Sequence, residues 1–330
     1  MIKESAWLII TLLISLGLQS VSVSAKETKG ENAAIVLAAF GTSYPEALTG
    51  IMNIKKRVED ACPGVPVKVA FTSNMIRKIW HKRIHDKDFK AANKSLPPDI
   101  FSVKGPLATI ADLQDKGYSN IIVQSLHIYN GEEYDDLVSY VKGLEAIKTL
   151  KTKNMPFERL AIGRPALGAN GDVHPYIDDI KEAARAVAED VREAQRKKAA
   201  LVYMGHGNKY YSSGAYAELQ DVMRSMYPDA KIFIGTVEGF PSFDQVMDKL
   251  KAEKIRKVLL KPFMEVAGDH ARNDMAGDAN TSWKRRLESA GIKVIADIHG
   301  LSENDAFADI FVRHIKDAAK DSGIEICGEK

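Results

Sequence analysis

Two histidines in the sequence stand in short polar segments that directly follow apolar runs. His206 lies between two glycines after the run AALVYM, and His270 lies in AGDHARND after KVLLKPFMEV. Two carboxylates stand in comparable places: Glu238 lies in GTVEG after AKIFI, and Glu133 lies in NGEEY after NIIVQSLHIY. Imidazole and carboxylate groups together bind divalent transition metals. Both also accept protons, and histidine does so near neutral pH because its ordinary pKa is about 6.5. These residue types therefore indicate a metal site that contains a proton acceptor.

A repeated pattern of strands and helices is expected to position these residues. Apolar runs predict strands at residues 33–40, 65–72, 120–128, 159–163, 199–207, 230–239, 256–266 and 292–300. Amphipathic helical segments separate the runs. Continuous apolar strands that alternate with such helices are typical of parallel sheets covered by helices on both faces. The predicted fold class is therefore α/β, with two similar doubly wound parallel-sheet domains and a cleft between them.

The same pattern divides the chain along its length. Residues 1–25 are predicted to be a signal peptide, residues 26–171 an N-terminal α/β domain, and residues 172–330 a C-terminal α/β domain that carries most of the metal-site residues. A helix over about 173–195 is expected to join the two domains. The connection over 85–105 contains two adjacent prolines and is longer than usual, so we expect it to form a flap.

The two halves can be aligned with each other. Placing NIIVQSLHIYNGEEYDDL on RKVLLKPFMEVAGDHARNDM brings Glu133 opposite His270, and placing VLAAFGTSY on LVYMGHGNK brings Thr42 opposite His206. The candidate residues then lie just past the carboxyl ends of parallel strands, which is the edge where open α/β sheets bind ligands. A lone histidine in such a place is more often a hydrogen-bonded structural residue. Several candidates at one edge favour a shared site.

The neighbours of His270 are expected to support it. Asp269, Asn273 and Asp274 are predicted to cap the next helix or to orient the imidazole of His270, without binding metal directly. Glu265, at the end of the preceding strand, is expected to be a surface carboxylate. The glycines on either side of His206 are expected to let a flat ligand approach the backbone closely.

The N-terminus, the net charge and the cysteines bear on the location of the protein and on its partners. A charged start, an apolar stretch over 6–18 and the small residues VSA at 23–25 predict export to the periplasm, with a retained N-terminal anchor as the alternative. No later stretch is apolar for long enough to cross a bilayer, so the processed chain is not expected to span a membrane. A net charge of +2 argues against a nucleic-acid partner. Cys62 and Cys327 could pair in an oxidising compartment or remain free.

Several motifs occur in one order along the chain: FGTSYPEA, AFTSNMIRK, VQSLHIYNGEEY, YMGHGN, GTVEG, MEVAGDHARNDMAGD and SWKRRLESAGI. From about Ala33 to the C-terminus they resemble the anaerobic cobalt chelatase of the cobalamin pathway. This family is the sirohydrochlorin cobaltochelatase of the CbiK type, a small class II chelatase distantly related to ferrochelatase. The resemblance implies insertion of Co²⁺ into sirohydrochlorin, a tetrapyrrole with eight carboxylates, without ATP. Fe²⁺ and Ni²⁺ are further candidate ions, because imidazole and carboxylate ligands discriminate poorly among these metals.

The resemblance also implies roles for particular residues. His206 and His270 fall on the metal-binding histidines of the family, Glu238 falls on the carboxylate of the VE motif, and Glu133 falls on that of the GEEY motif. His206, Glu238 and His270 would then hold the metal. His206, Glu133 and Glu238 would form the catalytic group, in which carboxylates assist the loss of the pyrrole protons.

Other residues are given weaker roles. Arg77, Lys78 and Lys209 are candidates for contacts with the substrate carboxylates, with ordinary surface charge as the alternative. His127 is a candidate axial ligand for a bound haem. The export signal and the long connection over 85–105 depart from the family pattern. An exported metal- or haem-binding or transport protein without turnover is therefore the alternative function, and a homo-oligomer is a further expectation.

Overall fold

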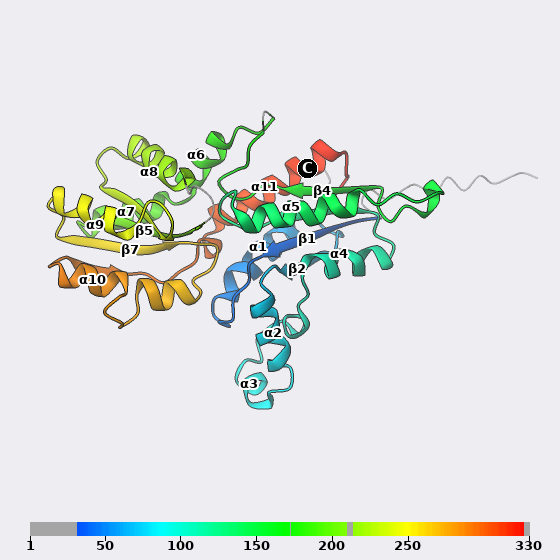
Figure 1. Cartoon of the computed structure of the whole chain (residues 1–330), viewed down its shortest axis with the longest axis horizontal. Helices are drawn as coiled ribbons and strands as arrows, with labels where there is room; N and C mark the ends of the chain where they lie inside the picture. The colour runs from blue at the N-terminus through cyan, green and yellow to red at the C-terminus, as the bar shows by residue number, and fades with distance from the viewer. Residues whose placement is uncertain (1–31, 172, 210–213, 327–330) are drawn as a thin grey trace, which may run out of the picture.

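Two parallel sheets form the framework of the computed structural model, which describes residues 32–171, 173–209 and 214–326 (Figure 1). The first sheet has the order β2-β1-β3-β4, with β1 (Ala33–Ala39), β2 (Val67–Phe71), β3 (Asn120–Ser125) and β4 (Arg159–Gly163). The second has the equivalent order β6-β5-β7-β8, with β5 (Ala200–Gly207), β6 (Ile232–Glu238), β7 (Lys257–Phe263) and β8 (Lys293–Ala296). The predicted strands and the α/β class with two similar parallel-sheet units are confirmed.

Helices cover both faces of each sheet (Figure 1). They are α1 (Leu48–Ala61), α2 (Asn74–Arg83), α3 (Lys87–Ala92), α4 (Pro106–Asp115), α5 (Glu132–Glu145), α6 (Tyr176–Ala186), α7 (Ala188–Arg196), α8 (Gly214–Met226), α9 (Phe243–Ala252), α10 (Trp283–Ser289) and α11 (Asp305–Ser322). Alternate residues of a strand point to opposite faces. Ile35 and Leu37 accordingly join the core shared with α1, whereas Val36 and Ala38 join the core shared with α4 and α5. Burial on both faces explains why β1 is apolar at every position.

The last helix returns to the first half of the molecule. Helix α11 packs against α1 and β4, although it follows β8 in the chain. Its residues Phe307 and Phe311 are fully buried, and the Phe307 ring lies 5.9 Å from that of Phe263 in β7. The expected division after residue 171 therefore separates the two sheets, while α11 packs against both halves. The expected joining helix is divided at Val187 into α6 and α7.

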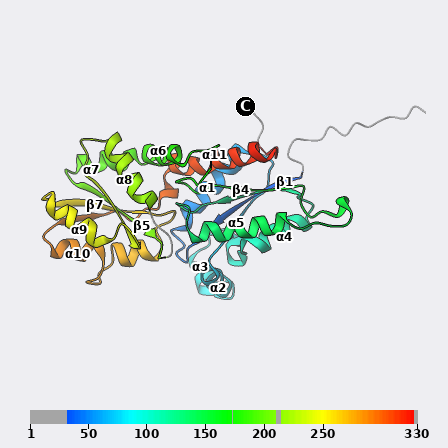
Figure 2. The same ribbon diagram turned by 45° about the horizontal axis from the view of Figure 1, so that its top comes forward.

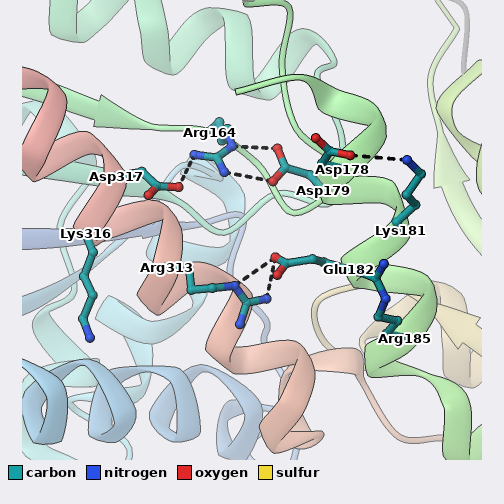
Figure 3. Close-up of a pocket in the computed structure, with 9 residues that line it drawn as sticks. All are labelled: Arg164, Asp178, Asp179, Lys181, Glu182, Arg185, Arg313, Lys316 and Asp317. Atoms are coloured by element: carbon teal, nitrogen blue, oxygen red, sulfur yellow. Dashed lines mark hydrogen bonds and ion pairs between the residues drawn. The ribbon is translucent and has the colours of Figure 1, made fainter. Parts of the chain in front are cut away.

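An ion-pair network links β4, α6 and α11 around a charged pocket of about 450 Å³ (Figure 3). Arg164, which follows β4, donates to both carboxylate oxygens of Asp179 at 2.6 and 2.9 Å, and to Asp317 at 2.8 Å. The buried His314 of α11 lies between these groups, with Nδ1 3.0 Å from the Arg164 carbonyl oxygen and Nε2 3.1 Å from Asp179. Arg313 pairs with Glu182 nearby, at 2.6 Å. Asp179 is the common acceptor in this network.

Replacing Asp179 by asparagine is expected to lower the free energy of unfolding by about 2–3 kcal/mol, because Arg164 and His314 lose charge-assisted bonds in a buried place. Burial alone would raise the pKa of Asp179, but hydrogen bonds and charges from His314 and Arg164 lower it below its ordinary value. Its contribution is therefore present above the unfolded aspartate pKa of about 3.9 and is lost as the pH falls through the lower folded pKa. Denaturant titrations at pH 7 and pH 3.5 test this.

The neighbouring Asp178 provides the matched control, since its exposed carboxylate pairs with Lys181 at 3.4 Å and takes no part in the bonds to Arg164 and His314 given above. Asp178→Asn should change the free energy of unfolding by less than about 0.5 kcal/mol. Equal effects of the two substitutions at pH 7 would contradict the role given to Asp179.

The long connection between α2 and α4 forms a small folded projection outside the two sheets (Figures 1 and 2). It contains α3 and the 3₁₀ turn η1 (Pro98–Ser102). Trp80, Phe89 and Phe101 pack edge to face, with ring centroids 5.8 to 6.4 Å apart. This aromatic cluster gives the projection a core of its own.

Some expectations fall on residues outside this description. The signal peptide and Cys327 are among them, so export and the pairing of Cys327 with Cys62 stay predictions. Cys62 itself is buried at the end of α1. In residues 32–171, 173–209 and 214–326, no helix combines the length and apolar character needed to cross a bilayer.

Candidate metal site

His206 and His270 meet at the carboxyl edge of the second sheet. His206 is next to last in β5, and His270 opens the π-helical turn η3 (His270–Met275), which follows the neighbouring strand β7. Their ring centroids are 4.9 Å apart and their planes are inclined by 77°. Imidazole nitrogens bind transition metals at about 2.1 Å, so two rings this close can reach one ion. The structure thus brings together the two histidines that the sequence pattern selected.

The hydrogen bonds of both imidazoles leave the same nitrogen available. Nδ1 of His206 lies 2.9 Å from the carbonyl oxygen of Gly207, which can only accept, so Nδ1 carries the hydrogen. Nδ1 of His270 lies 2.6 Å from the carboxylate of Asp274 and carries its hydrogen for the same reason. In its neutral form each ring then has its lone pair on Nε2. A hydrogen bond of this kind from the second ring nitrogen is the usual way in which a protein orients a metal-binding histidine.

The backbone on either side of His206 explains the two glycines differently from the sequence reasoning. A Cβ on Gly205 would lie 2.5 Å from the ring of Tyr216 in α8. A Cβ on Gly207, which has φ +75°, would lie 1.8 Å from the carbonyl oxygen of Glu238. The glycines are required because helix α8 and strand β6 pack against this end of β5. The approach of a flat ligand to this backbone stays a prediction.

Glu133 approaches the site from the first half of the molecule. It lies in the first turn of α5, after β3, and is partly buried. Burial raises the pKa of its carboxyl above the ordinary value, and a hydrogen bond from its own backbone and the nearby His206 lower it by smaller amounts. Glu133 and His206 are near enough to interact electrostatically, and a hydrogen bond of 3.0 Å from Tyr44, after β1, to Asp269, after β7, joins the carboxyl edges of the two sheets. A carboxylate with a raised pKa is a better proton acceptor near neutral pH than an ordinary one.

Glu238 occupies the expected strand end but has a different partner. It is the last residue of β6, in register with Gly207. Its Oε1 lies 3.1 Å from Nζ of Lys209, so Lys209 neutralises a carboxylate of the protein. In the described ranges, no three His, Cys, Asp or Glu side chains are gathered as a ligand set. The structure therefore supplies two imidazoles, and Glu238 would have to leave Lys209 to act as a third ligand.

Two basic residues of α2, Arg77 and Lys78, were candidates for contact with the substrate. Arg77 donates hydrogen bonds to the carbonyl oxygens of Phe71 and Thr72 and to the side chain of Asn74. Burial lowers its pKa. These contacts favour a structural role for Arg77 over contact with substrate carboxylates, because they use both terminal nitrogens of the guanidinium group. Lys78 is exposed on the same helix, and its contact with substrate stays a prediction.

His127 lies inside the first half, past the end of β3. Its Nδ1 is 2.9 Å from the Ser125 hydroxyl, and its Nε2 is covered by protein without a hydrogen-bond partner in the described chain. Burial lowers its pKa to about 4, so the ring is neutral at pH 7. An axial haem ligand must present a ring nitrogen to the iron. The covered Nε2 does not fit that role in this structure.

Sequence reasoning missed residues that join the halves behind the histidines. Tyr129, in the loop after β3, packs against Tyr216 of α8 with ring centroids 5.2 Å apart. Burial raises the pKa of Tyr216, and Tyr129 and Glu133 act in the same direction. The tyrosines of the motif YNGEEY could have suggested an aromatic contact at this loop. The sequence pattern did not identify the residue that Tyr129 would contact.

Glu265 is the clearest error of the sequence reasoning. It was expected at the surface, but it is 7% exposed, at the junction of the two halves. Its Oε1 has no partner in the described part of the chain. Burial raises its pKa well above the ordinary value, although the backbone N–H of Phe40, after β1, acts in the opposite direction. The carboxyl group lies where β1 and β7 end, and the packing of the two halves against each other buries it.

Glu265→Gln is expected to raise the thermal midpoint increasingly as the pH rises from 5 to 8. The folded protein keeps a proton that the unfolded chain releases above about pH 4.3, so this carboxyl lowers stability as the pH rises towards its folded pKa. Glutamine stays neutral throughout. Scanning calorimetry at several pH values measures the difference. Glu145→Gln, at an exposed position, is the control. A difference that does not change with pH would contradict the prediction.

Facing sheet edges that carry two imidazoles and a proton-accepting carboxylate are the features of a metal chelatase. The chain matches the cobalt chelatase (CbiK) family over residues 33–320. It is 33% identical over 286 residues to the sirohydrochlorin cobaltochelatase of Salmonella typhimurium, covering 86% of this chain and 96% of that protein. It is 30% identical over 281 residues to the sirohydrochlorin cobaltochelatase CbiKC of Nitratidesulfovibrio vulgaris, covering 85% of this chain and 88% of that protein. The chain belongs to the cobalt chelatase family.

Solved structures agree at the level of the fold. SirB from Bacillus subtilis with Fe³⁺ has a TM-score of 0.54 and 12% sequence identity, covering 90% of this chain and all of that one. The sirohydrochlorin chelatase SirB from Bacillus subtilis subspecies spizizenii in complex with cobalt has a TM-score of 0.54 and 10% identity, with the same coverage. At this identity the likeness concerns the two-lobed α/β architecture.

Proposed function

We propose that the protein inserts Co²⁺ into sirohydrochlorin without ATP, with the macrocycle held between the facing edges of the two sheets. The observation that carries this proposal is the pair of imidazoles 4.9 Å apart, which present Nε2 from the second half opposite a base from the first. Membership of the cobalt chelatase family supports the same reaction. The curated relatives act as sirohydrochlorin cobaltochelatases, according to their names.

The reaction exchanges two pyrrole protons for one dication, so the site needs groups that hold the metal loosely and groups that accept protons. Neutral imidazoles suit the first task, because two such ligands bind Co²⁺ or Fe²⁺ without enclosing it in a cage. Glu133 suits the second task, because burial raises its pKa towards neutrality. It can accept one pyrrole proton at a time and pass it to solvent. Glu238 can bind the metal or accept a proton when it leaves Lys209.

An assay with purified chain, sirohydrochlorin and each of Co²⁺, Fe²⁺, Ni²⁺ and Zn²⁺ tests the proposal. The absorption spectrum of the metallated product should appear over many turnovers, with Co²⁺ among the accepted ions. A stoichiometric complex that forms without turnover would overturn the proposal and favour the alternative of a binding or transport protein. Haem is outside the proposal, because Nε2 of His127 is covered.

We also propose that the protein acts after export to the periplasm. Support comes from the sequence of residues 1–25, with its apolar stretch and small residues before position 26. Fractionation of cells, followed by N-terminal sequencing of the recovered chain, tests this. A chain that begins at Met1 and stays in the cytoplasmic fraction would contradict export.

A further inference from the structure

A side chain of the first half, Tyr44, contacts the loop that carries His270. Tyr44 lies in the loop between β1 and α1, 225 positions before Asp269. Its hydroxyl donates a hydrogen bond to Asp269 Oδ1 at 3.0 Å. The guanidinium group of Arg272 lies over its ring, with Cζ 4.9 Å from the ring centroid. Tyr44 therefore contacts the residue directly before His270 and the residue two positions after it.

The loop that carries Tyr44 is fixed by the first half. The backbone N–H of Tyr44 donates to the buried Thr42 hydroxyl at 3.1 Å, and the Thr42 carbonyl oxygen accepts from Nε1 of the buried Trp80 at 2.7 Å. Arg83 donates to the Ser43 carbonyl oxygen at 2.5 Å. Trp80 and Arg83 both belong to α2, so this helix holds the loop in place through two hydrogen bonds. The backbone that carries the Tyr44 ring is therefore held by bonds within the first half.

The loop that carries His270 is bonded mainly to itself. Asp269 Oδ1 also accepts from the Asn273 side chain at 2.8 Å, and Arg272 Nε donates to the Ala267 carbonyl oxygen at 3.2 Å. These bonds close the π-helical turn, a form of helix that is rare and frequent at functional sites. They do not determine how the turn sits against the first half. That placement comes from the contacts with Tyr44, together with an exposed ion pair of 3.9 Å between Arg272 and Glu46.

We propose that Tyr44 is a positioning residue for His270. It fixes Asp269 and Arg272, and through them the place of the His270 imidazole relative to His206 and to Glu133. Because Glu133 also belongs to the first half, Tyr44 sets the separation between the metal-binding rings and the proton acceptor. This inference rests on the proposed function, in which His270 binds the metal.

Tyr44→Phe tests the inference because it removes the hydroxyl and keeps the ring. The KM for Co²⁺ and the Kd of the Co²⁺ complex should rise about tenfold, as for other residues that orient a ligand. The visible absorption bands of bound Co²⁺ should change, while the thermal midpoint and the KM for sirohydrochlorin stay close to those of the wild type. Asp269→Ala should reproduce these effects. Asp269→Asn, which keeps an acceptor oxygen, should restore most of the affinity.

Tyr176→Phe is the matched control, since it removes a comparable tyrosine–carboxylate bond of 3.3 Å, to Glu218 on α8. It should leave Co²⁺ binding unchanged. Wild-type affinity and bands in Tyr44→Phe, with loss of both in His270→Ala, would overturn the positioning role alone. A loss of affinity in Tyr44→Phe that is matched by a lower thermal midpoint would assign the residue to stability and also overturn it. Unchanged Co²⁺ binding in His270→Ala would instead overturn the proposed function.

Discussion

His270→Ala and His206→Ala are each expected to lower the rate of cobalt insertion by more than about a hundredfold. Removing a group that only orients a metal ligand commonly costs 10- to 100-fold in affinity or activity, and losing the ligand itself should cost more. The ring centroids lie 4.9 Å apart, so both imidazoles can bind one ion, and each variant leaves a single imidazole at the site. The measurement is the initial rate of formation of the metallated product, together with titration of the protein with Co²⁺.

The design of this test depends on the fold being kept. The side chain of His270 is 37% exposed, so its truncation leaves no large buried cavity. His85→Ala is the matched control, because His85 is exposed and lies before α3, in the projection. Asp274→Ala should give an intermediate loss of about 10- to 100-fold, since it removes the hydrogen bond at Nδ1 of His270 and keeps the ligand. Turnover at the wild-type rate in both histidine variants would remove the mechanism.

Glu133→Gln is expected to lower the rate of insertion by about 10²- to 10⁴-fold, the usual contribution of a general base, while Co²⁺ still binds. Glutamine has nearly the same shape and cannot accept a pyrrole proton. Glu132→Gln is the control, because it removes the same charge from the same turn of α5. A Glu133→Gln variant with near wild-type turnover would show that another group takes the protons.

The pH dependence gives an independent check on Glu133. Its pKa is raised by burial, so the wild-type rate should fall as the pH drops through that raised pKa, where the carboxyl becomes protonated and can no longer accept a proton. Glu133→Gln should lack this acidic limb. Rates measured at saturating substrate from pH 5 to pH 8 would show the difference. An identical acidic limb in both proteins would assign it to a different group.

The sheets and the edge that carries the site could be predicted from the sequence because their signals are local. A strand buried on both faces must be apolar at every position, as β1 is, so it can be recognised without its neighbours. The change from apolar to polar residues then marks the carboxyl end of each strand. Since all the strands of a parallel sheet end at one edge, His206, Glu238 and His270 had to lie near one another once the sheet formed.

Contacts between distant segments could not be predicted in this way. The burial of Glu265 depends on β1 and β7 ending at the same junction, and the return of α11 to the first sheet places Asp179, His314 and Arg164 together. The charge of Arg77 suits contact with substrate carboxylates, but its guanidinium group donates hydrogen bonds to nearby carbonyl oxygens. The pattern of residues along a helix or strand predicts which face of that element a side chain lies on. It does not predict which group of another element the side chain will contact.

The sequence by itself determined that His206, Glu238 and His270 lie at one edge of the second sheet, through the periodicity of burial and the shared direction of the strands. Only the tertiary structure decided how they are used. It uses Nδ1 of both histidines in hydrogen bonds and so leaves Nε2 for a metal, pairs Glu238 with Lys209, and brings Tyr44 to the His270 loop across 225 positions. The physical reason is that hydrogen bonds and burial depend on distance in space. Packing between the two halves sets that distance, and neither half encodes it alone.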